Sequence, residues 1–417
     1  MKGWITGKFG SFVRQYRGTS MNSLEKTSLT DAPQWSQRHR DWVLLFASMF
    51  SLLAGAAVAP ALPAMAAYFS HVPNVGTLTK LTLSTTALFI AVGAGPAGWL
   101  IDRIGRKPVL AAGALITGIA GTSGAALDSL YLILVSRALL GLGVACVVTS
   151  ATTLIGDVIE PARQASFFGR QTAAMKFGGI LFLLLGGALT TLSWRAVFLI
   201  DLLAFAILPG VLRGFPEATR RAVQPRARLS LPWRNARVLA PVFATFACQL
   251  FFYMIPTQVP FHLATTVKAA PMAISVAIAL NLVSAALVAT QIHRMIQWLG
   301  ARQVYALSLL TMALGFGLIG LGDSYGVFVC GLLVAGMGTG TIFPCAAAGI
   351  VSVVGEAQRG RVTGLLVMMA FAGQFISPLV LAPLVQSIGI GQSFLAAAAA
   401  LLACAVIVPL WLSAANE

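Results

Sequence analysis

Long apolar runs constrain this chain more than any other feature of its sequence. They recur from residue 42 to residue 413, and most are about 20 residues long, the length of helix that crosses a hydrocarbon layer of ~30 Å. A backbone in lipid must satisfy its own hydrogen bonds, so each run is predicted to be a transmembrane helix. Prolines, glycines and charged clusters divide the runs into twelve spans: 42–67, 79–101, 108–127, 130–155, 165–191, 195–213, 238–262, 271–295, 302–322, 325–353, 361–387 and 392–413.

The composition excludes the main alternatives to a membrane protein. Charged residues make up 10% of the 417 residues, whereas a soluble globular protein carries about 25%. So few charges cannot cover a soluble body of this size, which excludes a soluble enzyme, a nucleic-acid-binding protein and a disordered chain. The five cysteines lie inside apolar runs and form no CxxC pair, so neither a disulfide nor a metal site is expected.

The cations predict the orientation of the spans. Loops rich in lysine and arginine remain in the cytoplasm. Most of the 28 lysines and arginines precede the first span, follow span 6, or lie in the turns before spans 3, 5, 9 and 11. Only Lys80, Arg195 and Lys268 fall on the other side. Membrane topology therefore explains the net charge of +16, and both termini are predicted to be cytoplasmic, whether Met1 or Met21 begins the native chain.

An internal repeat divides the chain into two halves. A shift of 195 residues superimposes five glycine pairs: Gly105 on Gly300, Gly141 on Gly336, Gly143 on Gly338, Gly169 on Gly364 and Gly178 on Gly373. Two six-span halves with the same direction predict a parallel repeat, with a substrate site between the halves near the membrane midplane. The predicted organisation is a cytoplasmic tail (1–41), a six-helix bundle (42–213), a cytoplasmic linker (214–237), a second bundle (238–413) and a cytoplasmic tail (414–417).

The most specific motif joins spans 2 and 3, where residues 98–107 read GWLIDRIGRK. Glycines allow close approach of the turn and its helices, while an acid and several cations can bind a facing helix end. The segment resembles the G-x-x-x-D-R-x-G-R-[KR] signature of the major facilitator superfamily, and the twelve spans and the repeat extend the resemblance over the whole chain. Its motif residues are Gly98, Asp102, Arg103, Gly105, Arg106 and Lys107.

The resemblance implies a cytoplasmic latch that closes when the substrate site faces outward. Asp102 would lie against the start of span 11, near residues 360–362, where the helix dipole favours a negative charge. Arg106 would pair with Asp157 at the end of span 4. The second-half copy lacks both the acid and the arginine, so only one complete latch is expected. The alternative is that these charges only fix the topology.

Two cations lie deep inside predicted spans. Arg137 begins a segment of span 4, residues 137–143, that resembles the family's R-x-x-x-G-x-[GA] pattern. One interpretation is a role in substrate binding or proton coupling; the alternative is that Arg137 binds backbone carbonyls of span 1. Lys176 lies about ten residues into span 5, near the midplane by the helical rise. No acid lies at a comparable depth, although Asp201 is a few residues inside span 6. A buried unpaired lysine gives up its proton or binds an anion, so we expect a role in coupling; snorkelling is the alternative.

Uncharged polar residues in the second half are further candidates. Gln249, Tyr253 and Thr257 recur at i, i+4 and i+8 of span 7, which places them on one helical face. Asn281 in span 8 and Gln374 in span 11 are similar polar positions. Such groups either join helices or line a cavity, and with Arg137 and Lys176 they form the candidate set for the substrate cavity or coupling.

These observations predict an all-α membrane protein whose twelve transmembrane helices form two pseudo-symmetric six-helix bundles. Its predicted function is secondary active transport by alternating access. No Walker A pattern and no grouping typical of a membrane enzyme is present, so the chain is not expected to be an enzyme. No cofactor is expected, and the proton gradient is the predicted energy source.

Among the branches of the superfamily, the chain most resembles the drug:proton antiporters. This implies a monomer in a bacterial inner membrane that exports amphipathic compounds, neutral or anionic. The antiporter motif of span 5 lacks its proline here, at Gly178 and Gly179, so the direction stays open. The alternative is a proton symporter or facilitator that imports a small organic anion, and a non-transporting receptor or scaffold is a third reading.

Overall fold

The computed structural model of the chain describes residues 37–215, 236–353 and 356–414, and these residues form helices and short connections without a strand. The predicted tail (1–41) and linker (214–237) lie largely outside the described residues. The first half contains α3 (Gln37–Ala56), η1 (Ala59–Ala61), α4 (Leu62–Tyr68), α5 (Val75–Ile104), α6 (Arg106–Ser123), α7 (Leu130–Val158), α8 (Pro161–Leu192), η2 (Ala196–Ala206) and α9 (Ile207–Gly214).

The second half has the corresponding elements. They are α10 (Ala236–Phe252), α11 (Met254–Thr266), α12 (Pro271–Thr290), α13 (Ile292–Leu299), α14 (Ala301–Leu321), α15 (Tyr325–Val353) and α16 (Glu356–Ala414). The helix α16 turns back at Gly389, whose φ is 82°, so it supplies two spans. Every span predicted from the sequence coincides with one of these helices, with part of one, or with consecutive pieces, which confirms the all-α membrane fold.

Nine described helical stretches are long and apolar enough to cross a membrane, and one of them, Gly364–Ile407, contains the Gly389 turn. The two remaining spans are the broken helix α3–α4 and the helix α6, which begins with two cations and a proline. The turn between α5 and α6 depends on Gly105 (φ 94°), and the turn between α13 and α14 depends on Gly300 (φ 80°). Only glycine adopts such positive φ values without strain, so the repeat fixes the same turn twice.

The repeat also reappears in side-chain contacts. In the first half, the Thr86 hydroxyl of α5 donates to the carbonyl oxygen of Arg137 in α7, at 3.3 Å. In the second half, the Asn281 amide of α12 donates to the carbonyl oxygen of Leu332 in α15, at 2.8 Å. Both members of the second pair are 195 positions after those of the first. The same helix–helix contact is therefore built twice with different side chains.

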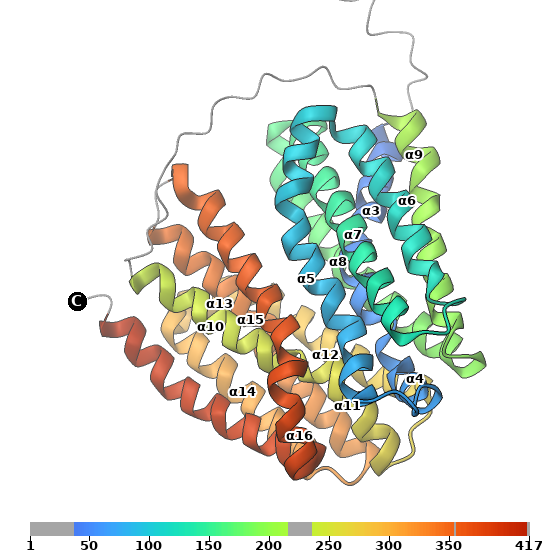
Figure 1. Ribbon diagram of the computed structural model, residues 1–417. Coiled ribbons are helices and arrows are strands. Elements are labelled where there is room, and N and C mark those ends of the chain that lie inside the picture. The colour runs from blue at the N-terminus through green and yellow to red at the C-terminus, as the bar shows by residue number, and fades with distance from the viewer. Residues whose placement is uncertain (1–36, 216–235, 354–355, 415–417) are drawn as a thin grey trace, which may run out of the picture.

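The two halves lie side by side, close together at one end and apart at the other (Figure 1). We call the separated end the basic end, because α5, α6, α9 and α14 place Arg103, Arg106, Lys107, Arg213 and Arg302 there. The opposite end, which carries Lys80, Asp128, Arg195 and Lys268, is called the far end. Contacts between the halves lie toward the far end, where Gly187 of α8 meets Ser275 of α12.

The close helix contacts predict which glycines tolerate a methyl group. A Cβ at Gly141 would lie 2.6 Å from the Thr86 carbonyl oxygen, and a Cβ at Gly336 would meet Ser284 and Asn281. We expect Gly141→Ala and Gly336→Ala each to lower the free energy of unfolding by roughly 1–3 kcal/mol, because the overpacked helices must separate. Thermal unfolding of the detergent-solubilised protein measures the effect.

Gly317 of α14 is the matched control, since no atom lies within 4 Å of a Cβ built there. Alanine is favoured over glycine inside a helix by about 1 kcal/mol, so Gly317→Ala is expected to keep or raise the unfolding temperature. Equal unfolding temperatures for all three variants would contradict the packing assigned to the repeat.

Candidate functional site

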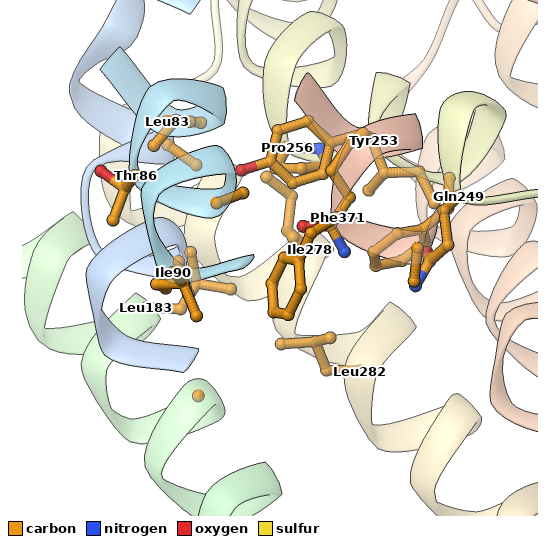
Figure 2. Close-up of a pocket in the computed structure, with 18 of the residues that line it drawn as sticks. Leu83, Thr86, Ile90, Leu183, Gln249, Tyr253, Pro256, Ile278, Leu282 and Phe371 are labelled. Atoms are coloured by element: carbon orange, nitrogen blue, oxygen red, sulfur yellow. The ribbon is translucent and has the colours of Figure 1, made fainter. Parts of the chain in front are cut away.

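A cavity of about 320 Å³ lies between the two halves, a volume typical of a small-molecule site. The first half contributes residues of α3, η1, α5 and α8, and the second half contributes residues of α10, α11, α12, α15 and α16. Figure 2 shows Leu83 and Ile90 of α5 on one side of the cavity, opposite Tyr253 and Phe371 of the second half. Because both halves supply the walls, a movement of one half against the other changes the access to this cavity.

The cavity walls are apolar with a few polar groups. Phe252, Phe343 and Phe371 contribute aromatic surface. Among the described residues, no charged side chain lines the cavity. The polar side chains on the walls are Thr86, Gln249, Tyr253, Asn281 and Gln374. Such walls favour an amphipathic guest, which buries apolar surface and forms a small number of directional hydrogen bonds.

Four of the predicted polar residues line the cavity, namely Gln249, Tyr253, Asn281 and Gln374. Thr257 does not: it is fully buried, and its hydroxyl donates to the Tyr253 carbonyl oxygen at 2.6 Å. The lining face of this segment runs instead through Phe252, Tyr253 and Pro256, at the boundary between α10, which ends at Phe252, and α11, which begins at Met254. Thr86 is a lining residue that was not predicted, although the repeat pairs it with Asn281.

Asn281 combines a structural contact with an open acceptor. Its Nδ2 atom donates to the Leu332 carbonyl oxygen of α15, so the amide joins two helices. Its Oδ1 atom is buried and accepts no hydrogen bond from the described residues. A buried acceptor without a donor is unfavourable, and a guest with a hydroxyl or an N–H group in the cavity can supply that donor.

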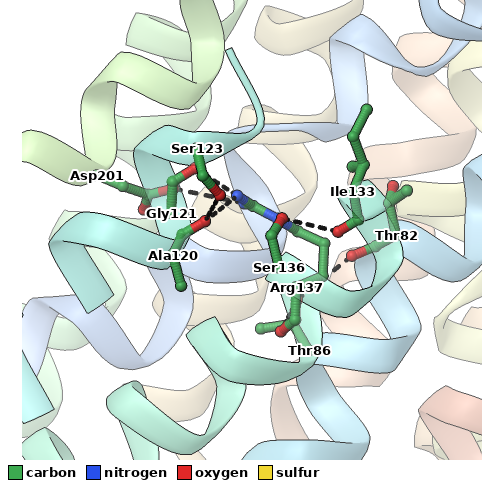
Figure 3. Close-up of polar contacts among 9 residues, drawn as sticks. All are labelled: Thr82, Thr86, Ala120, Gly121, Ser123, Ile133, Ser136, Arg137 and Asp201. Atoms are coloured by element: carbon green, nitrogen blue, oxygen red, sulfur yellow. Dashed lines mark hydrogen bonds and ion pairs between the residues drawn. The ribbon is translucent and has the colours of Figure 1, made fainter. Parts of the chain in front are cut away.

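Arg137 does not line the cavity, which corrects the position predicted from the sequence. Its side chain is 1% exposed, and one guanidinium nitrogen lies 3.4 Å from Oδ2 of Asp201. The other donates to the carbonyl oxygens of Ala120 and Gly121 (Figure 3), and the Phe198 ring lies 4.7 Å from the guanidinium carbon. The backbone carbonyls belong to the third span rather than the first, and the group joins α6, α7 and η2 within one half.

Asp201 is the partner that the sequence analysis did not assign. The structure places it on η2, buried, with its side chain packed against Gly121 of α6. A side chain on residue 121 would occupy the space that the carboxylate fills, so the glycine makes the pair possible. Two sequence features could have predicted this ion pair: an isolated acid in the apolar segment 196–212, which requires a cation, and the isolated arginine of span 4.

Lys176 lies on α8 beside the cavity but not on its wall. Its neighbour Met175 and the residue one turn later, Gly179, line the cavity, whereas Lys176 itself is half-buried. Within the described part of the chain, its ammonium has no hydrogen bond and no ion pair. Since α8 runs from the basic end to the far end, Lys176 is level with the first of the α8 residues that line the cavity.

The predicted latch is only partly described. Asp102 is exposed at the end of α5, and the Arg103 guanidinium lies 4.2 Å from the Trp99 ring centroid. The side chains of Asp157 and of residues 360–362 lie outside the described residues, so the predicted latch contacts stay predictions. Figure 1 shows the basic end of α5 standing apart from the start of α16. The other motif residues are Gly98 within α5, Gly105 between α5 and α6, and Arg106 and Lys107 at the start of α6.

The sequence of this chain matches a family model and several known proteins. Residues 44–259 and 241–416 match the sequence model of the Major Facilitator Superfamily. The inner membrane transport protein YnfM of Escherichia coli (strain K12) is 30% identical over 139 residues, 33% of this chain and 33% of YnfM. The chain therefore matches about a third of YnfM.

Two longer similarities cover most of the chain. The quinolone resistance protein NorA of Staphylococcus aureus (strain MSSA476) is 23% identical over 347 residues, which are 81% of this chain and 88% of NorA. The crystal structure of a D-xylose–proton symporter is similar to this chain with a TM-score of 0.74 and 16% sequence identity. The alignment covers 89% of this chain and 97% of that chain. The structural similarity shows a shared fold.

The Arg137–Asp201 pair predicts a large loss of stability when one partner is removed. Asp201→Asn leaves a buried guanidinium unpaired, so we expect the free energy of unfolding to fall by about 3–5 kcal/mol. The matched control is Asp128→Asn, because Asp128 pairs with Arg195 but its side chain is 77% exposed, and an exposed pair contributes about 0–1 kcal/mol. Thermal unfolding of both variants measures the difference. A loss in Asp201→Asn no larger than in Asp128→Asn would contradict the assignment.

Proposed function

Because the chain belongs to the major facilitator superfamily, it is a membrane transporter and not an enzyme. We propose that it exports amphipathic organic compounds by proton-coupled alternating access. The observation that carries this proposal is the apolar cavity, which the two halves line together. In a parallel repeat transporter, rocking of the halves exposes such a site first to one compartment and then to the other.

The distribution of cations supports an orientation. We place the basic end and both termini in the cytoplasm, since cationic loops are retained there, and the far end outside a bacterial inner membrane. The halves approach each other at the far end and stand apart at the basic end (Figure 1), and in this proposal the cavity is reached from the cytoplasm in this conformation. A cytoplasmic compound can enter the cavity in this conformation. The protein acts as a monomer in this proposal.

The chemistry of the walls supports neutral or anionic cargo. Aromatic and aliphatic surface binds the apolar part of a guest, and the amides of Gln249, Asn281 and Gln374 bind its polar part. No described carboxylate lines the cavity to bind a cation. The similarity to NorA, a quinolone resistance protein, supports export as the direction.

The latch gives the second conformation of this cycle. When the cavity opens at the far end, the basic ends of the halves approach each other. In that state Asp102 binds the start of α16 near residues 360–362, where the helix dipole favours a negative charge, and Arg106 pairs with Asp157. The exposure of Asp102 in the present conformation agrees with a latch that is open when the basic end is open.

Transport in membrane vesicles tests the direction. Everted vesicles that contain the protein and are acidified inside should accumulate a naphthyl carboxamide and the corresponding naphthyl carboxylate, because protons leaving the lumen drive the cargo inward. Vesicles without the protein are the control. Accumulation only in right-side-out vesicles would support the importing alternative instead, and no accumulation in either would refute the proposed function.

Lys176 is proposed to carry the coupled proton. Lys176→Ala should therefore remove the dependence of transport on the acid gradient while leaving passive exchange of the naphthyl carboxamide, since an alanine cannot bind and release a proton. The matched control is Arg170→Ala, six residues earlier on α8 and exposed, with its guanidinium over Phe167. Transport by Lys176→Ala with an unchanged dependence on pH would refute this role.

A further inference from the structure

A second cation without a described acidic partner lies at the far end of the cavity. Lys80 is on the second turn of α5, only 7% of its surface is exposed, and its Nζ atom lies 5.0 Å from the centroid of the Phe261 ring. Phe261 belongs to α11, so this contact joins the two halves. Within residues 37–215, 236–353 and 356–414, no carboxylate forms an ion pair with Lys80. Lys80 is one of the three cations on the predicted outer side of the membrane, and the sequence predicts no further role for it.

Lys80 continues the face of α5 that lines the cavity. Leu83, Ala87 and Ile90 are lining residues, and positions 80, 83, 87 and 90 share one helical face. Lys80 precedes Leu83 by three residues, about 4.5 Å along the helix axis, toward the far end. When the far end opens, the cavity extends past Leu83 and reaches this ammonium group.

The repeat shows that a cation is not needed to close the far end. A shift of 195 residues pairs Lys80 with Ser275, which is also buried and also faces the opposite half, where it meets Gly187 of α8. The second half therefore closes its side of the interface with a small neutral residue. Closure of the far end therefore does not explain why the first half has a lysine at the corresponding position.

The free energy of burying the Lys80 ammonium group also indicates a role other than closure of the far end. The attraction between an ammonium group and a ring face is smaller than the free energy lost when the ammonium leaves water. An aliphatic residue facing Phe261 would close the far end better. In the conformation in which the halves separate at the far end, the Lys80 ammonium group gains hydration or an anionic partner.

We propose that Lys80 is a specificity-determining residue that binds the acidic group of an amphipathic organic anion when the cavity is open at the far end. This inference rests on the proposed function, and it assigns a carboxylate-bearing class to the cargo. In the far-end-open conformation, Lys80 exchanges the Phe261 ring for the carboxylate, while the apolar part of the anion remains against the cavity walls. A neutral compound passes the same point without this interaction.

Counterflow exchange in right-side-out vesicles tests the proposal, because these vesicles present the far end to the outside in the proposed orientation. Vesicles are loaded with the naphthyl carboxamide, and the apparent affinity of external naphthyl carboxylate is compared with that of external carboxamide. Lys80→Met should weaken the external carboxylate about tenfold, the effect of one hydrogen bond to a charged group, and leave the carboxamide unchanged. Presented at the basic end, in everted vesicles, the carboxylate should keep its affinity.

Three further variants make the result specific. Lys80→Arg keeps the positive charge and should keep the preference for the carboxylate. Lys268→Met removes an exposed lysine from the same end and should change neither affinity. Phe261→Leu removes the ring but not the charge, so the ratio of the two affinities should stay at the wild-type value.

The failures of the two proposals are distinguishable. If wild-type vesicles exchange neither probe, the proposed function is wrong and the role of Lys80 with it. If wild-type exchange is present, and Lys80→Met weakens both probes equally or weakens neither, only the role of Lys80 is overturned. A change in the ratio by Phe261→Leu that matches the change by Lys80→Met would also overturn it, because the effect would then come from closure of the far end.

Discussion

An ionised side chain loses its hydration when it enters hydrocarbon, and this loss governs where the few charges of the described helices lie. Arg137 and Asp201 compensate for it by pairing, and two carbonyl oxygens of α6 accept hydrogen bonds from the same guanidinium. Such a pair is unfavourable to separate, because each partner alone would be a buried charge. It therefore makes α6, α7 and η2 one body. Lys80 and Lys176 have no comparable partner within the described residues, so their surroundings are free to change with conformation.

The repeat gives both halves the same internal contacts, and the charged pair is an addition to one of them. Thr86 and Asn281 tie equivalent helices together, and Gly141 and Gly336 bring those helices close enough for the contact. Between the halves the described contacts are different in kind: a glycine against a serine, and an ammonium over a ring. Hydrogen-bonded packing within each half and a weakly polar interface between them favour movement of the halves as bodies, with the cavity at their boundary.

The sequence was sufficient for the fold and for part of the site. Span positions follow from hydrophobic length, and the polar residues Gln249, Asn281 and Gln374 were recognisable because polar groups are rare at this depth. The direction of each side chain was less predictable: the cavity face of this segment passes through Phe252, Tyr253 and Pro256, whereas the Thr257 hydroxyl donates to the Tyr253 carbonyl oxygen. Arg137 was misplaced for another reason: its partner Asp201 is 64 residues away in the chain, and no local pattern connects them.

Selection by shape and selection by charge are spatially separate in this architecture. The cavity walls contribute apolar surface and uncharged hydrogen-bonding groups, which bind a guest by its size and polarity but distinguish anions from neutral compounds weakly. The two cations without an acidic partner among the described residues lie beside the cavity, with Lys176 toward the basic end and Lys80 beyond Leu83 toward the far end. A buried charge on the wall itself would hold an anion tightly in both conformations and slow its release. A charge at a margin acts only while that margin is open, so it can favour an anion at one stage of the cycle without trapping it at the next.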